Sequence, residues 1–207
     1  MLALLGAPAF ADSPLRVLAF GDSLTAGLNL PAESAFPAQL ERRLRADGFI
    51  VDVVNAGVSG DTSGGGLERI DFALGEKFDL VILELGANDM LRGIDPKLTR
   101  QNLEKMLDAI SAKSVPVLLA GMLASDNFGP ERKAAFDAIH PDLAKERGLP
   151  LYPFFLAGVA GEASLVQKDG LHPTAEGVAR IVAGVAPMVE DALRAVLTKT
   201  APDARAK

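Results

Sequence analysis

The sequence predicts an α/β fold in which helices cover both faces of a parallel sheet. Short runs rich in Val, Ile and Leu alternate with longer segments whose apolar residues recur at helical spacing. Each short run leads into a loop that contains glycine, and this alternation is typical of βαβ units. The runs are apolar throughout, as in strands buried on both faces. We therefore expect a three-layer α/β/α sandwich of the flavodoxin-like type, with a five-stranded parallel sheet in the order 2-1-3-4-5.

The boundaries of these elements follow from the apolar periodicity. The expected strands cover residues 15–20, 50–55, 80–85, 115–121 and 149–154. The expected helices cover residues 35–47, 66–74, 96–113, 131–147 and 174–198. Thr174 is of a residue type favoured at a helix N-cap. No repeat or linker interrupts the pattern, so we expect one domain over residues 12–198 and a frayed tail over residues 199–207.

The composition excludes several classes of protein. The 207 residues are 49% hydrophobic and 23% charged, which is sufficient for a folded domain with one core. The net charge is −6 and no basic stripe is present, so we expect no nucleic-acid partner. No apolar run approaches the roughly 18 residues of a membrane span. The absence of cysteine excludes disulfides, thiolate metal sites and a cysteine nucleophile. The oligomeric state is left open by the sequence.

Residues 1–11 have the features of a secretory signal peptide. The segment MLALLGAPAFA is apolar and uncharged, and it ends in AFA, which fits an A-x-A cleavage site after Ala11. A complete signal begins with a basic segment, whereas the first positive charge here is Arg16. We therefore interpret residues 1–11 as a truncated signal peptide and expect a periplasmic or secreted protein.

Ser23 lies directly after the first expected strand, in the segment GDSLTAG at 21–27. Sheets of this type bind ligands at the carboxyl ends of their strands, so the Ser23 hydroxyl is a candidate nucleophile. A serine between a strand and a helix is more often a helix N-cap than a nucleophile, and this alternative stays open.

Two further loops offer hydrogen-bond donors at the same edge of the sheet. The glycine-rich segment after the second strand supplies the backbone N–H groups of Gly57 and Gly60. The segment after the third strand supplies the side-chain amide of Asn88. Such groups form oxyanion holes. Asn88 is equally compatible with an Asx turn, in which it would bond only its own backbone.

A carboxylate and an imidazole occur together just before the last expected helix. Asp169 and His172 are three residues apart in the segment DGLHP. A serine nucleophile needs an imidazole base that a carboxylate orients, and this spacing supplies both groups on one loop. The other histidine, His140, lies among charged residues in a helical pattern, so we expect it on the surface.

The motifs carry a family resemblance when they are taken together. They occur in one order along the chain: GDSLTAG at 21–27, NAGVSGDTSGGGLERI at 55–70, VILELGANDMLRG at 81–93 and DGLHPTAEG at 169–177. The chain resembles the SGNH (GDSL) hydrolase superfamily, and within it the periplasmic arylesterase, thioesterase I and lysophospholipase group. The resemblance implies a triad of Ser23, Asp169 and His172. It also implies an oxyanion hole formed by the backbone N–H of Ser23, by Gly60 and by Asn88, with no cofactor and no metal.

The expected activity is hydrolysis of carboxylic esters or thioesters through an acyl-enzyme on Ser23. The substrate would be a small aryl or short-to-medium acyl ester, an acyl-CoA or a lysophospholipid. Met90, Leu91 and Ile94 follow Asn88 and are candidates for contact with the acyl chain. Two alternatives stay open: a carbohydrate acetyl-esterase or peptidase-like hydrolase of the same fold, and a non-catalytic flavodoxin-like binding domain. The absence of Trp and the single Tyr count against a flavin site.

Overall fold

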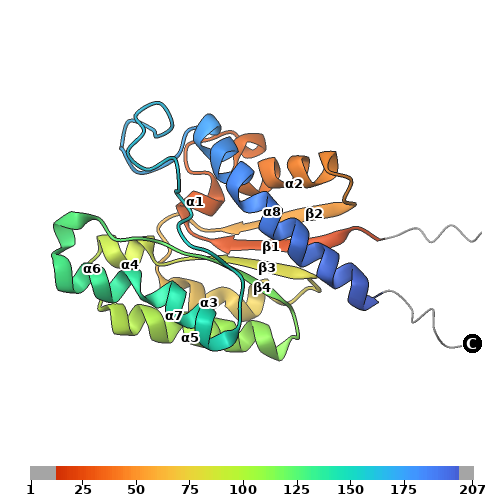
Figure 1. The fold of residues 1–207 in the computed structure, drawn as a ribbon, viewed down its shortest axis with the longest axis horizontal. Helices are drawn as coiled ribbons and strands as arrows, with labels where there is room; N and C mark the ends of the chain where they lie inside the picture. The colour runs from red at the N-terminus through yellow and green to blue at the C-terminus, as the bar shows by residue number, and fades with distance from the viewer. Residues whose placement is uncertain (1–12, 201–207) are drawn as a thin grey trace, which may run out of the picture.

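The computed structural model describes residues 13–200, which form one parallel sheet between two layers of helices (Figure 1). The strands are β1 (Leu15–Gly21), β2 (Val51–Gly57), β3 (Leu80–Glu84), β4 (Val117–Ala120) and β5 (Leu151–Tyr152). All neighbouring strands pair in parallel, in the order β2-β1-β3-β4-β5. The predicted fold class and strand order are therefore confirmed. The expected signal peptide over residues 1–11 lies outside the described residues.

Helices cover both faces of the sheet (Figure 1). One layer contains α2 (Phe36–Ala46) and α8 (Ala175–Thr200), which pack against each other. The other layer contains α3 (Ser63–Ala73), α5 (Pro96–Ala112) and α7 (Ile139–Arg147). The remaining helices are α1 (Ser23–Ala26), α4 (Ala87–Leu91), α6 (Pro130–Asp137) and the 3₁₀ turns η1 (Ala32–Ser34) and η2 (Asp126–Phe128). In Figure 1, α1, α4 and α6 lie towards the carboxyl ends of the strands.

The core lies on both faces of the central strands. All five residues of β3 are buried, as are the last five residues of β1. In α8 the buried residues recur every three or four positions, at Val178, Ile181, Val185, Val189 and Leu193. This spacing turns one stripe of the helix to the sheet, and removing that apolar area from water stabilises the fold. No helix within residues 13–200 combines the length and apolar content needed to cross a membrane.

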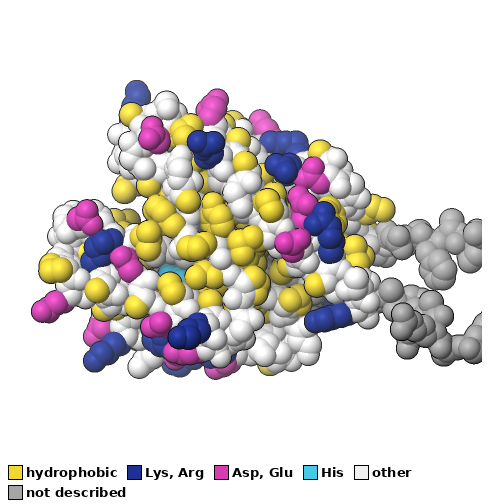
Figure 2. Space-filling view, viewed as in Figure 1, with side chains coloured by type: hydrophobic (Ala, Val, Ile, Leu, Met, Phe, Trp, Pro, Cys, Tyr) yellow, Lys and Arg dark blue, Asp and Glu magenta, His cyan; other side chains and the backbone are white. Residues whose placement is uncertain are grey.

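The edge strand β5 is shorter than predicted. It has two residues instead of the six expected over 149–154, because Pro150 and Pro153 bound it and lack the N–H group of a sheet ladder. In Figure 1 the chain around β5 runs between α8 and α7, and Figure 2 shows apolar side chains gathered along the middle of that face. A short, proline-bounded edge is a poor template for further strand pairing.

The prediction of one continuous helix over residues 131–147 is wrong. The structure contains two helices, α6 and α7, which meet at Ala138. Pro141 explains the break, since its ring clashes with the carbonyl four residues earlier and its nitrogen cannot donate. At the C-terminus, α8 continues to Thr200, beyond the position where the frayed tail was expected to begin. Residues 201–207 of that expected tail lie outside the described residues.

Candidate active site

The carboxyl ends of three strands bring the predicted functional loops to one edge of the sheet. Gly21, the last residue of β1, pairs with Gly57 of β2 on one side and with Glu84 of β3 on the other. The loops that follow therefore start at the same level of the sheet. A pocket of about 670 Å³ opens there, with Ser23, Gly60, Asn88 and His172 in its wall.

Ser23 is the first residue of α1, and Asp22 is the N-cap of that helix. The Asp22 carboxylate accepts a hydrogen bond from the backbone N–H of Leu24 at 2.9 Å, the usual contact of a capping side chain. The capping alternative for Ser23 is therefore wrong. The Ser23 hydroxyl instead lies 2.8 Å from Nε2 of His172.

The Asp169–His172 pair is built within one loop, residues 169–172, which we call the Asp–His loop. Oδ2 of Asp169 lies 2.7 Å from Nδ1 of His172, while Oδ1 accepts the backbone N–H groups of Leu171 and His172 at 2.9 and 3.0 Å. These backbone bonds, with the imidazole, lower the pKa of Asp169 to about 2. The carboxylate is thus ionised at neutral pH, and it holds the imidazole with Nε2 towards Ser23.

Donors for an oxyanion border the same pocket as Ser23. Gly60 adopts a φ of +86°, which favours glycine, and no acceptor within residues 13–200 takes its N–H group. The N–H of Ser23 belongs to the first turn of α1, where helical amides have no intrahelical acceptor. Gly57 does not contribute, because its N–H donates to the side chain of Asn55 at 3.0 Å.

Asn88 does not form the Asx turn that its sequence context also allowed. Its side-chain Nδ2 donates to Oδ2 of Asp22 at 3.0 Å, across 66 positions of sequence. One amide hydrogen is thereby fixed by the residue next to the nucleophile. The second hydrogen has no acceptor within the described chain, and the side chain borders the pocket.

Behind this edge lie seven polar side chains that are at most 1% exposed, which we call the buried polar layer. Its members are Asp22, Thr25, Ser63, Glu84, Asp89, Thr99 and His140. Asp89 accepts from the backbone and hydroxyl of Ser63 and, at 3.0 Å, from the hydroxyl of Thr99. These bonds join the starts of α3, α4 and α5, and so fix the helix that carries Asn88.

His140 is buried rather than exposed, so its predicted surface position is wrong. Its side chain is 0% exposed and Nε2 lies 3.1 Å from the carbonyl oxygen of Leu85. Burial lowers the pKa of His140 to about 4, because the interior disfavours the charged imidazolium. The imidazole is therefore neutral at pH 7 and donates to the turn that precedes Asn88. The charged residues around it in sequence lie on the outer face of α7 and concealed this role.

Arg69 is a second residue that the sequence analysis missed. Its guanidinium donates to the carbonyls of Gly21 and Ala56, both at 2.9 Å, and to the carboxylate of Asp61 at 2.6 Å. It also lies over the ring of Phe20, 3.9 Å from the ring centre. Arg69 thus ties the end of β1 to the loop that carries Gly60. In the sequence, Arg69 was marked only by its position three residues after the glycines at 64–66.

The pocket has apolar walls suited to a hydrocarbon chain. Met90 and Leu91 line it, as expected, whereas Ile94 does not: it faces a separate void of about 10 Å³ beside Phe128 and Phe136. The other large apolar side chains of the lining come from α1 and from the loops after α1, β4 and β5, and were not predicted. These residues are Leu24, Leu28, Met122, Leu123, Phe154, Leu156 and Leu171.

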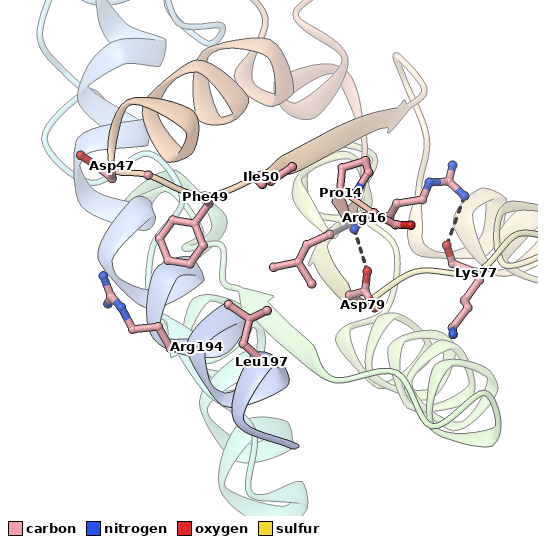
Figure 3. A pocket seen from close by; sticks show the side chains of 12 residues that line it. Pro14, Arg16, Asp47, Phe49, Ile50, Lys77, Asp79, Arg194 and Leu197 are labelled. Carbon is pink, nitrogen blue, oxygen red and sulfur yellow. Dashed lines mark hydrogen bonds between the residues drawn. The ribbon is translucent and has the colours of Figure 1, made fainter. Parts of the chain in front are cut away.

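A larger hollow of about 840 Å³ lies at the opposite edge of the sheet, where the strands begin (Figure 3). Figure 3 shows Asp79 receiving the backbone N–H of Arg16, at 2.8 Å, and the Arg16 guanidinium reaching the carbonyl of Lys77, at 3.2 Å. The described lining contains neither histidine. The geometry of Ser23, His172 and Asp169, and not size, therefore makes the smaller pocket the candidate active site.

Comparisons with known proteins found a matching family and several similar proteins. Residues 19–180 match the GDSL-like Lipase/Acylhydrolase family. The chain is 40% identical to Esterase TesA of Pseudomonas aeruginosa, over 86% of this chain and 89% of that protein. It is also 40% identical to thioesterase 1/protease 1/lysophospholipase L1 of Escherichia coli K12, over 76% and 74%. The crystal structure of TesA superposes with a TM-score of 0.82 and 39% identity, covering 86% of this chain and 99% of that one.

Proposed function

We propose, for a chain that belongs to the GDSL-like Lipase/Acylhydrolase family, that Ser23, His172 and Asp169 carry out its ester hydrolysis. The chain is a serine hydrolase that acts on ester bonds. The observation that supports the triad is the unbroken contact from Ser23 Oγ to His172 Nε2, at 2.8 Å, and from His172 Nδ1 to Asp169, at 2.7 Å. This is the arrangement that lets an imidazole remove a proton from a serine hydroxyl.

In the first half-reaction Ser23 Oγ attacks the ester carbonyl while His172 Nε2 takes the hydroxyl proton. Asp169 stabilises the imidazolium, since its low pKa keeps it ionised throughout. His172 then returns the proton to the leaving alcohol or thiol, and an acyl group remains on Ser23. In the second half, His172 activates a water molecule that releases the acid and restores the hydroxyl.

The negative charge that develops on the carbonyl oxygen needs donors that are in place beforehand. The N–H groups of Ser23 and Gly60 and the free hydrogen of Asn88 border the same pocket. We assign these three groups to the oxyanion hole. Because the charge forms only in the transition state, their contribution belongs to kcat more than to KM.

The acyl part of the substrate would occupy the apolar walls formed by Met90, Leu91 and the loops after β4 and β5. We assign short-to-medium acyl esters and thioesters as the substrate class, and we include acyl-CoA and lysophospholipids in it. The hydrolase relatives argue against a non-catalytic binding domain. A carbohydrate acetyl-esterase differs in its need for sugar-binding polar groups, so an acetylated sugar belongs in the substrate panel.

The test is Ser23→Ala assayed on a p-nitrophenyl ester, an acyl-CoA, a lysophospholipid and an acetylated sugar. Loss of the nucleophile is expected to lower kcat by about 10⁴-fold or more on every substrate the wild type accepts. Circular dichroism checks that the variant folds. Activity of Ser23→Ala near that of the wild type would remove Ser23 from the mechanism. A preference of the wild-type protein for the acetylated sugar would replace the proposed substrate class.

We also propose that the protein is exported to the periplasm or secreted, on the basis of the A-x-A site that ends at Ala11. The mature chain would then begin at Asp12. Expression from the complete gene, followed by intact mass of the exported protein, tests this. A cytoplasmic product that retains residues 1–11 would contradict it.

A further inference from the structure

Two acidic side chains of the buried polar layer lie directly behind the nucleophile. Asp22 is 0% exposed and Glu84 is 1% exposed. Within residues 13–200 neither carboxyl group forms an ion pair with a Lys, Arg or His side chain. Two adjacent carboxylates sealed from water without a cation would repel each other, so one of the two must carry a proton.

The contacts of Glu84 connect β3 to the loop that carries Ser23. Oε2 of Glu84 accepts the hydroxyl of Thr25 at 2.8 Å and faces the backbone N–H of Asp22 at 3.4 Å. Space for this carboxyl group exists because residue 21 is glycine: a Cβ there would lie 2.6 Å from Oε2 of Glu84 and 2.1 Å from Oγ1 of Thr25. The glycine at position 21 therefore leaves the room that the Glu84 carboxyl group occupies.

We propose that Glu84 is a positioning residue: it keeps its proton, leaves Asp22 as the anion, and through Asp22 fixes the orientation of the Asn88 amide. The inference rests on the proposed role of Asn88 in the oxyanion hole. Glu84 itself touches neither the pocket nor the reacting atoms. Glu84 affects the reaction through Asp22, which in turn accepts a hydrogen bond from Asn88.

The charge on Asp22 decides which way the amide of Asn88 faces. An ionised carboxylate only accepts hydrogen bonds, so it selects the NH₂ end of the amide, as the 3.0 Å contact shows. The second hydrogen of that NH₂ then remains available to the pocket. A protonated Asp22 could donate instead and select the amide oxygen, and the oxyanion would lose a donor.

The surroundings of the pair favour the proton on Glu84. Burial raises the pKa of Glu84 well above its usual range, and the neighbouring Asp22 raises it further. Burial also raises the pKa of Asp22, to about 6, but four interactions oppose this: the N–H of Leu24, the amide of Asn88, the charge of His172 and a side-chain hydrogen bond from Glu84. Asp22 is thus the more acidic of the two.

The direct test detects the proton without using catalysis. Infrared difference spectra of wild type and Glu84→Gln at pH 7 should contain a protonated carboxyl band that only the wild type contributes. A wild-type spectrum without that band would overturn the inference. Because the measurement does not involve turnover, it is independent of the proposed triad, whose failure would appear in Ser23→Ala.

The kinetic test compares Glu84→Gln with Glu84→Met on an aryl ester. Gln is neutral and can both accept from Thr25 and donate to Asp22, so it should keep kcat within about threefold. Met offers neither bond, so kcat should fall at least about tenfold with KM little changed. The acid limb of the kcat profile should also move to higher pH in Glu84→Met, by roughly half a unit or more, since Met cannot form the side-chain hydrogen bond from Glu84 that lowers the pKa of Asp22.

Ile82→Val is the matched control, since Ile82 is buried in the same strand and Val only removes a methyl group. It should lower Tm slightly and leave the acid limb in place. Glu84→Gln as inactive as Glu84→Met would mean that an ionised Glu84 is required, and would overturn the inference. A folded Glu84→Met with wild-type kcat and pH profile would overturn it equally. If Glu84→Met does not fold, the infrared band and Glu84→Gln decide.

Discussion

The Asp–His loop lies at the surface, whereas the buried polar layer lies behind Ser23 and Asn88, sealed from water. The side chain of Asp169 is 38% exposed, and its contacts stay within three residues of sequence. In the layer, the bond from Thr25 to Glu84 joins residues 59 positions apart. A loop built from local contacts can lose its chemistry without unfolding the protein. Loss of a group from the layer should instead lower stability, because these groups are paired with partners from other elements.

The two histidines give the largest contrast. His172→Ala should lower kcat by about 10⁴-fold or more, with Tm changed by no more than roughly 2 °C because the backbone bonds that Asp169 accepts within the loop are kept. His140→Ala should do the reverse: loss of a packed, hydrogen-bonded ring costs about 2–4 kcal/mol and lowers Tm by roughly 6–12 °C. Activity of its folded fraction should stay within about threefold of wild type. Calorimetry and kinetics on both variants check this, and an inactive, fully folded His140→Ala would break the contrast.

Asn88 lies where the two regions meet, so its variants should affect both activity and stability. Asn88→Ala removes one donor of the proposed oxyanion hole and should lower kcat by about 10²- to 10³-fold with little change in KM. Asn88→Asp should be at least as inactive. Asn88→Asp should also be less stable than wild type, because its carboxylate would face that of Asp22 across the present 3.0 Å contact. Tm should therefore fall further in Asn88→Asp than in Asn88→Ala.

Acid should weaken the fold through His140, with an effect next in size. The pKa of His140 falls from 6.5 to about 4 on folding, so the unfolded chain takes up a proton more readily. The free energy of unfolding is therefore unaffected by the titration of His140 above pH 6.5 and falls by on the order of 3 kcal/mol as the pH is lowered towards 4. Asp22 acts in the opposite sense, because its raised pKa favours folding as the pH falls through 6. Denaturant unfolding of wild type and His140→Gln isolates the histidine contribution; equal losses in both would contradict it.

Arg69→Lys should give the smallest effect. Lysine keeps the charge but cannot reach Gly21, Ala56 and Asp61 together, as the planar guanidinium does. The loop carrying Gly60 would be less well positioned, and kcat should fall by about three- to tenfold with KM within about twofold. Arg45→Lys is a matched control, since Arg45 is an exposed arginine on α2 that binds Glu41 and Asp52. A drop in kcat as large in Arg45→Lys would remove Arg69 from this role.

The same contrast explains what could be predicted from the sequence. The strands and most of the helices followed from apolar periodicity, and the Asp169–His172 pair could be recognised because both residues lie on one short loop. Element ends were less predictable where proline intervened, at Pro141 and around β5. The short helix α4 was missed because five residues are too few to show a helical period.

The buried polar layer could not be predicted, because its bonds join elements that approach each other only after folding. Nothing in the neighbourhood of His140 distinguishes a buried imidazole from an exposed one. Glu84 ends a strand whose other residues are all apolar, and this isolated acid in an apolar run was the one available signal. Such a signal indicates that a partner exists without saying which residue it is.

The most direct test of the central claim is a structure of the protein inactivated by an alkyl phosphonate. The reaction should form a bond between phosphorus and Oγ of Ser23, since the reagent captures an activated serine. The phosphonyl oxygen should accept hydrogen bonds from the N–H groups of Ser23 and Gly60 and from Nδ2 of Asn88, with His172 beside Oγ. A phosphonate bound to Ser59 or Ser63, or an oxygen turned away from Asn88, would contradict the proposed site.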